Sequence, residues 1–338
     1  MHRENILISS AGRRVGLTQC FRSALKDLGL DGKLLAVDAS VDSPATHLVD
    51  ESWQVPRCTD PAFIPEVLRI CEREKVLLLV PTIDTELLVY ARAKHLFAEI
   101  GCHVSVPSPE TVAIASDKVE THAWLLENGF PTVRQTTPGA ILADPGAWTF
   151  PLIVKPARGS ASQGVARVES LEKLRYQASQ DTTLVAQELA RGEEFTINVF
   201  VDGRGQCLCA VPHRRIEVRA GEVSKAVTVK NRVLMQSARE VVERLPGAYG
   251  ALNIQCFVDA GEMKIIEINA RFGGGYPLAD RAGAKFTRWL LEDCLQLPST
   301  ASFEGWEDDL AMLRYDEAVF LPGQEIRREH AAAAVSGV

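Results

Sequence analysis

The first hundred residues alternate short apolar runs with longer amphipathic stretches. Four of the apolar runs are typical of buried strands: residues 5–9, 34–37, 77–80 and 103–106. Three stretches between them have the apolar spacing of helices: residues 15–28, 62–74 and 86–100. This alternation predicts a parallel sheet with helices on both faces. Pro107 and Pro109 mark its end, so that residues 1–107 are expected to form an α/β domain.

A different pattern begins near residue 151, where strand-like runs follow one another with only a few helices between them. These runs are residues 152–155, 165–168, 184–187, 194–201, 207–211, 249–258 and 264–269. Several are joined by glycine-containing turns, which predicts an α+β domain with antiparallel sheets. The C-terminal part offers one strand, at residues 311–314, and an alanine-rich tail at 331–338 that we expect to be disordered.

The composition is that of an ordinary globular chain of 338 residues, long enough for about two domains, with 46% hydrophobic and 24% charged residues. A net charge of -7 without a long basic tract disfavours nucleic acids and anionic membrane surfaces as partners. No apolar run is long enough for a secretion signal or a membrane-spanning helix. The eight cysteines are scattered, without a Cys-x-x-Cys pair, so we expect a reduced, cytoplasmic protein.

The turn after the first predicted strand is a candidate for ligand binding, and Asp38 ends the second strand. A dinucleotide-binding fingerprint needs three closely spaced glycines, but only Gly12 and Gly16 are present, with two arginines between them. Two interpretations stay open. The turn is either a solvated helix N-terminus or a site for an anionic substrate group, assisted by Arg13 or Arg14.

Lys155 ends a predicted strand, and a loop of small residues from Gly159 to Gly164 precedes the next strand. The loop is not a P-loop, because lysine and Ser or Thr do not follow its second glycine. It is not a nucleophile elbow either, because Ser160 rather than glycine stands two residues before Ser162. Such a strand-loop-strand can fold over a triphosphate, with Lys155 supplying positive charge. An ordinary hairpin loop is the alternative.

The strongest candidate is a predicted hairpin that leads into Arg271 and three glycines. Alternate side chains of a strand share a face, so Glu267, Asn269 and Arg271 should point together. If the turn is the three residues 260–262, Gln255 pairs with Glu267 on that face. One carboxylate with two amide oxygens suits Mg²⁺, which takes further ligands from water and nucleotide phosphates. A solvated sheet face is the alternative.

Together these motifs look like those of the ATP-grasp superfamily. The matching residues follow the family's order: Lys118 after Asp117, Lys155 before its glycine loop, residues 185–190, Glu194 within residues 193–196, and then Gln255, Glu267, Asn269 and Arg271. The chain most resembles a single ATP-grasp unit of the large subunit of carbamoyl-phosphate synthase, over nearly its whole length. Biotin carboxylase and D-alanine:D-alanine ligase are more distant matches.

The resemblance implies a fold and a division into parts. A Rossmann-like α/β domain, the pre-ATP-grasp domain, would precede an α+β ATP-grasp fold of two lobes. The expected parts are the N-terminal domain at residues 1–107, linker helices and the small lobe at 108–189, the large lobe with a C-terminal extension at 190–325, and a disordered tail at 326–338.

The resemblance also implies roles for individual residues, with ATP and Mg²⁺ or Mn²⁺ as cofactors. The ATP-binding set would be Lys118, Lys155, Gly159, Ser160, Ser162, Gly164, Gln187, Glu188, Leu189, Ala190 and Glu194. In this set, the two lysines and the glycine loop would hold the ATP phosphates. Residues 187–190 would bind the adenine, and Glu194 would bind the ribose. The metal ligands would be Gln255, Glu267 and Asn269. Lys155 and Arg271 would be catalytic, and Arg271 would stabilise an acyl phosphate and the tetrahedral intermediate that follows it.

A lone ATP-grasp unit, with neither a second copy nor a glutaminase domain, resembles a carboxylate-amine ligase. Such an enzyme activates a small-molecule carboxylate as an acyl phosphate, which an amine attacks to give an amide or peptide bond, ADP and phosphate. The alternatives are a phosphotransferase acting on a small acid or hydroxyl, and a non-catalytic ATP-binding module. Some similar proteins are homodimers, which leaves a homodimer open here.

Substrate residues are expected among charged or flexible positions near strand ends. The candidates are Arg13, Arg14, Asp84, Glu86, Arg215, Lys225, Gly274 and Tyr276. Arginines would suit a substrate carboxylate and the acidic residues an ammonium group, while the glycines would let the backbone approach a ligand closely. For each charged residue, a helix cap or a surface ion pair is the alternative.

Overall fold

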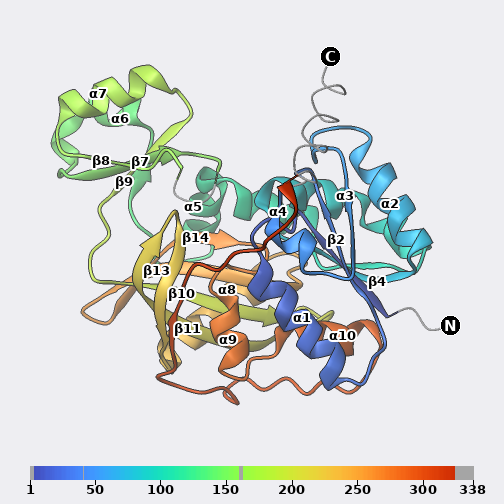
Figure 1. Cartoon of the computed structure of the whole chain (residues 1–338). Coiled ribbons are helices and arrows are strands. Elements are labelled where there is room, and N and C mark those ends of the chain that lie inside the picture. The colour runs from blue at the N-terminus through green and yellow to red at the C-terminus, as the bar shows by residue number, and fades with distance from the viewer. Residues whose placement is uncertain (1–3, 41, 160–162, 324–338) are drawn as a thin grey trace. The chain divides into compact units, whose positions relative to one another are not determined.

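The computed structural model describes residues 4–40, 42–159 and 163–323, and it divides into two compact units. The first unit contains the described residues up to Val106 together with residues 285–301 and 314–323. The second contains the described residues of 107–284 together with residues 302–313. Figure 1 shows the elements of both units.

The first unit is built on a parallel sheet of five strands in the order β3-β2-β1-β4-β5. The strands are β1 (Asn5–Ser9), β2 (Leu34–Asp38), β3 (Glu51–Gln54), β4 (Val76–Pro81) and β5 (His103–Val104). Helices cover both faces: α1 (Val15–Asp27) and α10 (Phe286–Cys294) lie on one, and α2 (Phe63–Arg73) and α3 (Asp84–Glu99) on the other, with the short η1 (Pro44–His47) after β2 (Figure 1). The parallel sheet with helices on both faces is confirmed. The edge strand β3 was not predicted, because its sequence Glu-Ser-Trp-Gln is mostly exposed and lacks an apolar run.

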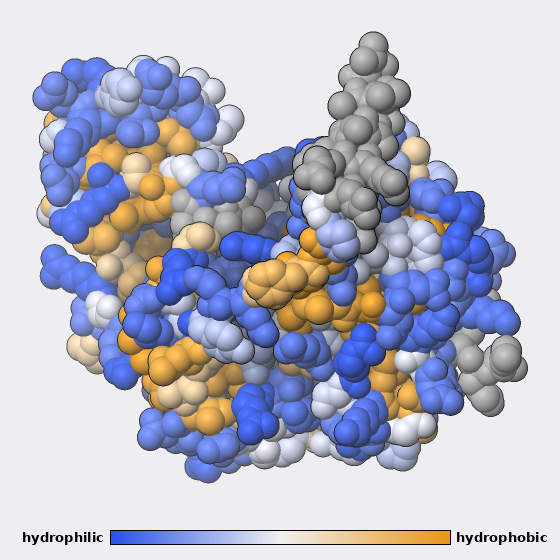
Figure 2. Space-filling view, viewed as in Figure 1, coloured by the Kyte–Doolittle hydropathy of each residue, from blue (hydrophilic) through white to orange (hydrophobic). Residues whose placement is uncertain are grey.

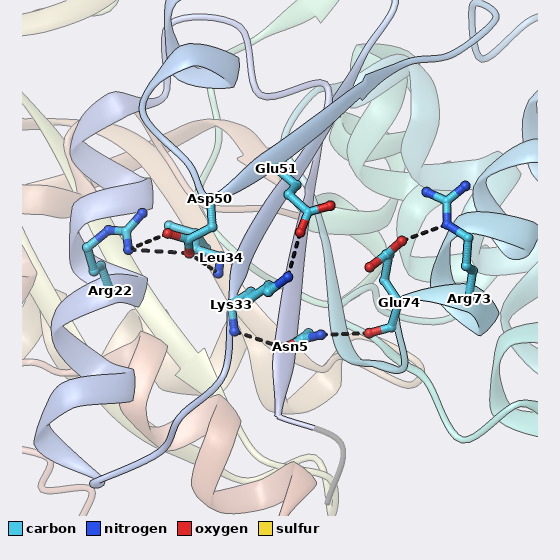
Figure 3. Close-up of polar contacts among 8 residues, drawn as sticks. All are labelled: Asn5, Arg22, Lys33, Leu34, Asp50, Glu51, Arg73 and Glu74. Atoms are coloured by element: carbon cyan, nitrogen blue, oxygen red, sulfur yellow. Dashed lines mark hydrogen bonds and ion pairs between the residues drawn. The ribbon is translucent and has the colours of Figure 1, made fainter. Parts of the chain in front are cut away.

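Polar residues tie together the amino ends of these parallel strands (Figure 3). Asn5 accepts from the Lys33 backbone N–H at 2.8 Å and donates to the Glu74 carbonyl at 2.6 Å. Asp50 accepts from the Leu34 N–H at 2.7 Å and pairs with Arg22 at 3.2 Å. The salt bridge between Arg22 and Asp50 is exposed and contributes little stability. The hydrogen bonds of Asn5 and Asp50 to the backbone are what join the amino ends of these strands.

The second unit begins with a small sheet, in the order β6-β9-β7-β8, on which two helices pack. In chain order, this part of the second unit contains α4 (Pro109–Ser116), α5 (Lys118–Glu127), β6 (Gln135–Thr136), α6 (Pro138–Ala143), η2 (Pro145–Ala147), β7 (Leu152–Pro156), β8 (Ala166–Val168), α7 (Leu171–Gln180) and β9 (Leu184–Glu188). Ile141 and Leu174 of the helices pack on Leu152, Val154 and Ala186 of the strands. The outer side of α6 and α7 is mostly hydrophilic (Figure 2), so these helices bury one face against the sheet.

The rest of the second unit is a large antiparallel sheet in the order β14-β13-β10-β11-β12-β15. Its elements are β10 (Glu193–Val201), β11 (Cys207–Arg219), β12 (Glu222–Thr228), α8 (Arg232–Arg244), β13 (Gly250–Asp259), β14 (Glu262–Asn269), α9 (Tyr276–Arg281) and β15 (Ala311–Leu313). The predicted antiparallel α+β region is confirmed. The pattern missed β12 and the C-terminal half of β11, because charged residues interrupt the apolar alternation of this hairpin.

All eight cysteines carry free thiols. Among the described residues, no helix combines the length and the hydropathy that a membrane crossing requires. The predicted tail at 331–338 lies outside the described residues.

Candidate active site

A row of polar side chains crosses one face of the large sheet. In the strand pairing, Thr196 of β10 lies opposite Gln255 of β13, which lies opposite Glu267 of β14. The next row on that face pairs Asn198 with Asn253, and Asn253 with Asn269. Directly opposed residues of an antiparallel sheet point to the same side. The structure therefore brings all three predicted metal ligands together on one face.

The hairpin between β13 and β14 pairs Gln255 with Glu267 as predicted, but its turn and register differ from the predicted ones. The turn has two residues, Ala260 and Gly261, both with positive φ (49° and 87°), and Asp259 pairs with Glu262. A two-residue turn of this kind would shift the register by one. A bulge between Gln255 and Cys256 absorbs the difference. The expected three-residue turn is thus wrong, while the expected pairing of Gln255 with Glu267 is present.

Arg271 follows β14 and reaches back along it. Its Nη2 donates to Asn269 Oδ1 at 3.2 Å, and its Nη1 donates to the Phe272 carbonyl at 3.1 Å. The Arg271 carbonyl accepts from Asn253 Nδ2 at 3.1 Å. The guanidinium therefore lies beside the row of predicted metal ligands, where it can stabilise negative charge on a bound group.

Lys155 lies on the face of the small sheet that points away from α6 and α7. Its neighbours Leu152 and Val154 face those helices, and alternate residues of a strand face opposite ways. The Lys155 side chain is buried, at 6% exposure. Burial lowers the pKa of its amine to about 8; the Glu267 carboxylate opposes this shift and the Lys118 ammonium adds to it. The charges of Glu267 and Lys118 therefore both act on the Lys155 amine.

The start of the glycine loop is attached to the start of α5. Lys118 Nζ donates to the Gly159 carbonyl at 2.9 Å, and the Lys118 N–H donates to the Ala157 carbonyl at 2.9 Å. Arg158 pairs with Asp117 at 2.9 Å. Both predicted lysines thus flank this loop. Ser160 and Ser162 lie outside the described residues; Gly164, at the other end, has a φ of +70°.

The segment from Gln187 to Ala190 leaves the small sheet beside two polar partners, Gln135 and Lys264, which were not among the predicted site residues. Gln187 Nε2 donates to Gln135 Oε1 at 2.5 Å, and Gln135 Nε2 donates to the Lys118 carbonyl at 2.9 Å. Glu188 pairs with Lys264 of β14 at 2.7 Å. Leu189 is 36% exposed and Ala190 half-buried. Gln135 and Lys264 thus hold this segment from two sides.

Glu194 begins the polar face on β10 and is half-buried. Burial raises the pKa of its carboxyl group; Arg215 opposes this shift, and the Glu267 carboxylate adds to it. The side chains of Arg215 and Glu194 are joined by a 3.2 Å contact between Nε and Oε1. Arg215 is therefore bound to another predicted site residue.

Four of the predicted substrate residues follow β1 and β4 in the first unit. Arg13 is exposed, and Arg14 and Asp84 are half-buried. Glu86 is fully buried: it accepts hydrogen bonds from Ser9 Oγ, Ser10 Oγ and the Thr82 N–H, each at 2.7 Å. Burial raises the pKa of Glu86, and these bonds oppose the rise. Glu86 is a structural residue in this unit, which corrects its assignment as a substrate ligand.

The Asp38 carboxylate accepts from the Gly12 N–H at 2.8 Å and from the Ser40 N–H at 2.9 Å. These two hydrogen bonds hold the turn after β1, so the Asp38 carboxylate has a structural use in this unit.

Three further substrate candidates are used by the second unit itself. Tyr276 is buried, at 1% exposure, and its hydroxyl donates to Asp280 Oδ1 at 3.1 Å. Lys225 pairs with Glu217 at 2.6 Å across the β11–β12 hairpin. A Cβ atom on Gly274 would lie 2.9 Å from Glu222 Cδ. The backbone at Gly274 thus lies close to a side chain of the sheet, and its predicted role stays a prediction. The burial of Tyr276 removes that residue from the substrate set.

The same packing makes Gly275→Ala a destabilising change. The added Cβ would lie 2.8 Å from His213 Nε2 and 2.9 Å from Val223 Cγ1, both buried. Burial, with Arg215 adding to it, lowers the pKa of His213 to about 3, so a neutral ring fills this space. Overpacking of this kind costs about 1–3 kcal/mol. Urea unfolding should show that loss.

Gly139→Ala is the matched control for Gly275→Ala. Gly139 lies in helix α6, and its added Cβ would lie 4.0 Å from its nearest neighbour. Alanine favours a helix over glycine by about 0.5–1 kcal/mol, so this variant should be at least as stable as the parent. A Gly275→Ala protein as stable as the parent would contradict the packing described here.

The predicted metal ligands fit a cation that arrives with a nucleotide better than a resident one. Gln255, Glu267 and Asn269 supply one carboxylate and two amides on neighbouring strands. Among residues 4–40, 42–159 and 163–323, no group of three or more His, Cys, Asp or Glu side chains could hold a metal ion. A set with a single carboxylate suits Mg²⁺ when phosphate oxygens complete its shell.

Comparison with sequence families agrees with this geometry. The family described as PylC-like, N-terminal domain, matches residues 6–105, and the family described as ATP-grasp domain matches residues 115–275. Residues 115–275 are an ATP-grasp domain. The predicted Lys118, Lys155, Glu194, Gln255, Glu267, Asn269 and Arg271 all lie within that match.

Part of the chain is similar in sequence to D-alanine–D-alanine ligases. A D-alanine–D-alanine ligase of Nitrosococcus oceani is 40% identical over 100 residues, which are 27% of this chain and 31% of the relative. The chain thus spans about a third of the length of the curated relatives that it matches. Its own activity therefore has to be argued from its residues.

The solved structures show that the fold is shared over most of the chain. N5-carboxyaminoimidazole ribonucleotide synthetase from Thermotoga maritima has a TM-score of 0.64 at 20% identity, over 88% of this chain and 78% of that one. The biotin carboxylase domain dimer of the Hydrogenobacter thermophilus 2-oxoglutarate carboxylase, in complex with MgADP, ADP and bicarbonate, has a TM-score of 0.70 at 15% identity, over 92% of this chain and 74% of that one. The expected Rossmann-like domain followed by an ATP-grasp fold is confirmed.

Proposed function

We propose that this protein is an ATP-dependent ligase that joins a carboxylate to an amine and releases ADP and phosphate. The observation that carries the proposal is the row in which the Glu267 carboxylate pairs with Gln255 on one face of the large sheet, next to Asn269 and the guanidinium of Arg271. The buried amine of Lys155, whose pKa the Glu267 carboxylate raises, supports it. This is a site for a polyphosphate with its metal. The partial similarity to D-alanine–D-alanine ligases supports the choice of an acid and an amine as the substrates.

Within the proposal, Lys118 and Lys155 bind the ATP phosphates and lie on either side of the loop that Gly159 begins. Residues 187–190 bind the adenine, and Glu194 binds the ribose. Gln255, Glu267 and Asn269 would hold Mg²⁺, which neutralises charge on the transferring phosphoryl group. A carboxylate oxygen of the acid takes the γ-phosphoryl group as ADP leaves.

Arg271 then faces the product of that transfer, an acyl phosphate. Its guanidinium is fixed by Asn269 and by the Phe272 carbonyl, so it is oriented before the substrate binds. The amine attacks the acyl carbon, phosphate leaves with the bonding electrons, and the amine loses a proton. Arg271 stabilises the oxyanion that forms when the amine attacks and that collapses when phosphate leaves. A cytoplasmic location and a homodimer stay predictions.

Trapping with hydroxylamine tests the proposed activation step without knowledge of the natural amine. Pooled carboxylates are incubated with the protein, Mg-ATP and hydroxylamine, and the products are separated by mass spectrometry. A hydroxamate of one acid, formed together with equimolar ADP, is the expected product. ADP accompanied by a stable phosphorylated hydroxyl compound and no hydroxamate would show a phosphotransferase instead.

A further inference from the structure

Two neighbouring arginines on β11 have opposite surroundings. Arg214 lies 2.6 Å from Glu193 in a surface pair whose side chains are 43% and 58% exposed. The Arg215 side chain is 7% exposed, and its Nε lies 3.2 Å from Glu194 Oε1. Consecutive residues of a strand point to opposite faces, so only Arg215 is on the polar face that carries the candidate site.

The Arg215 guanidinium has a polar neighbour at each of its three nitrogens. Nη1 donates to Thr196 Oγ1 at 3.2 Å, and Nη2 donates to the Gly221 carbonyl at 3.5 Å. Nε faces Glu194 without the alignment of a hydrogen bond. Because the guanidinium is planar and rigid, these contacts fix where its charge lies. That charge is set against the Glu194 carboxylate.

Arg215 is also the group that favours the ionised form of Glu194. Burial and the Glu267 carboxylate both raise the pKa of Glu194, and only Arg215 acts in the other direction. An ionised carboxylate is purely an acceptor and can receive two hydroxyl groups at once. A vicinal diol, such as that of a ribose, offers this pair of donors.

We propose that Arg215 is a positioning residue that holds the Glu194 carboxylate in place to accept both hydroxyls of the nucleotide ribose. The proposal rests on the proposed function. It also takes Arg215 out of the set of substrate ligands, because the contacts of its guanidinium are with Glu194, Thr196 and the β11–β12 turn.

Calorimetric titration of the full chain with Mg-ATP and with Mg-2′,3′-dideoxy-ATP tests this without any acid or amine. The parent should bind ATP about 10- to 100-fold more tightly than the dideoxy nucleotide, because hydrogen bonds to an ionised group are among the strong ones. Arg215→Met should bring the two affinities to within about threefold of each other. Arg214→Met, which removes the neighbouring surface arginine, should keep the parent's ratio. An Arg215→Met protein with the parent's ratio would overturn the proposal.

Two further variants keep the test decisive. Arg215→Lys retains the charge without the planar fork and should give a ratio between those of the parent and Arg215→Met. If circular dichroism shows that Arg215→Met does not fold, an unchanged ratio in Arg215→Lys overturns the proposal instead. Glu194→Gln should lose the ratio as well. A Glu194→Gln protein that keeps it would show that the nucleotide assignment of the proposed function has failed, rather than the role of Arg215 alone.

Discussion

Replacement of Glu267 by glutamine is expected to lower the rate of ADP formation by at least about 100-fold. The change keeps the shape of the side chain opposite Gln255 but removes the single carboxylate of the predicted metal ligands. Charge stabilisation by a bound metal is worth several kcal/mol, and each 1.36 kcal/mol is about tenfold in rate. The measurement is ADP release at saturating ATP over a range of Mg²⁺ concentrations.

Glu262→Gln is the matched control for this prediction. Glu262 begins the same strand, β14, and is exposed, so its replacement should leave both turnover and the urea midpoint unchanged. Glu267→Gln keeps the shape of the side chain and should fold, with a lower midpoint only as far as the lost carboxylate no longer favours the Lys155 ammonium. Undiminished ATP consumption by Glu267→Gln would refute the metal assignment.

Replacement of Lys155 by methionine is expected to stabilise the protein without nucleotide while it removes turnover. In the folded protein burial lowers the pKa of Lys155 from 10.5 to about 8. The protonated amine is therefore disfavoured in the folded state, by about 3 kcal/mol below pH 8, because each pKa unit corresponds to about 1.36 kcal/mol. The penalty declines as the pH rises from 8 and is gone above 10.5. Urea unfolding at pH 7 should therefore show a gain of up to about 3 kcal/mol for Lys155→Met.

The same lysine is expected to be needed for ATP. Loss of a charge-assisted contact to phosphate lowers affinity by about 10- to 100-fold, so a given concentration of Mg-ATP should raise the melting temperature of the parent more than that of Lys155→Met. Lys173→Met, on the exposed face of α7, should change neither stability nor ATP binding by more than about 0.5 kcal/mol. A Lys155→Met protein that is less stable than the parent at pH 7 would contradict the burial described here.

Most of the fold follows from the hydrophobic pattern because the central strands of both units are apolar runs. The strands β1, β2 and β4 are entirely or almost entirely buried, and each was predicted within two residues at its ends. The elements that the pattern missed bury little or mix charges with apolar residues. The edge strand β3 is mostly exposed, and β12 contains a buried serine, Ser224, and a half-buried lysine, Lys225, which interrupt its apolar alternation. Their pairing depends on neighbouring strands, which a local pattern does not contain.

The candidate site was predictable where strand alternation alone decides which side chains share a face. Glu267 and Asn269 are two residues apart in β14, so their common face follows from the strand period. Arg271 lies beyond the end of the strand and joins them through its hydrogen bond to Asn269. Their partners on other elements do not follow in this way. Gln135 and Arg215 contact Gln187 and Glu194 across strand pairings that join distant segments. Lys264 contacts Glu188 from a strand of the other sheet. The burial of Glu86 and Tyr276 likewise depends on tertiary packing, and it is this that misled their assignment as substrate residues.

The most direct test of the proposed ligase is the mass of its product. The protein is incubated with Mg-ATP and pooled carboxylates and amines, ADP and phosphate are quantified, and any active pool is resolved into single pairs. The account predicts a compound lighter by one water than the sum of one acid and one amine, formed with one ADP and one phosphate. A product that carries the phosphoryl group, with no free phosphate released, would contradict the account and identify a phosphotransferase.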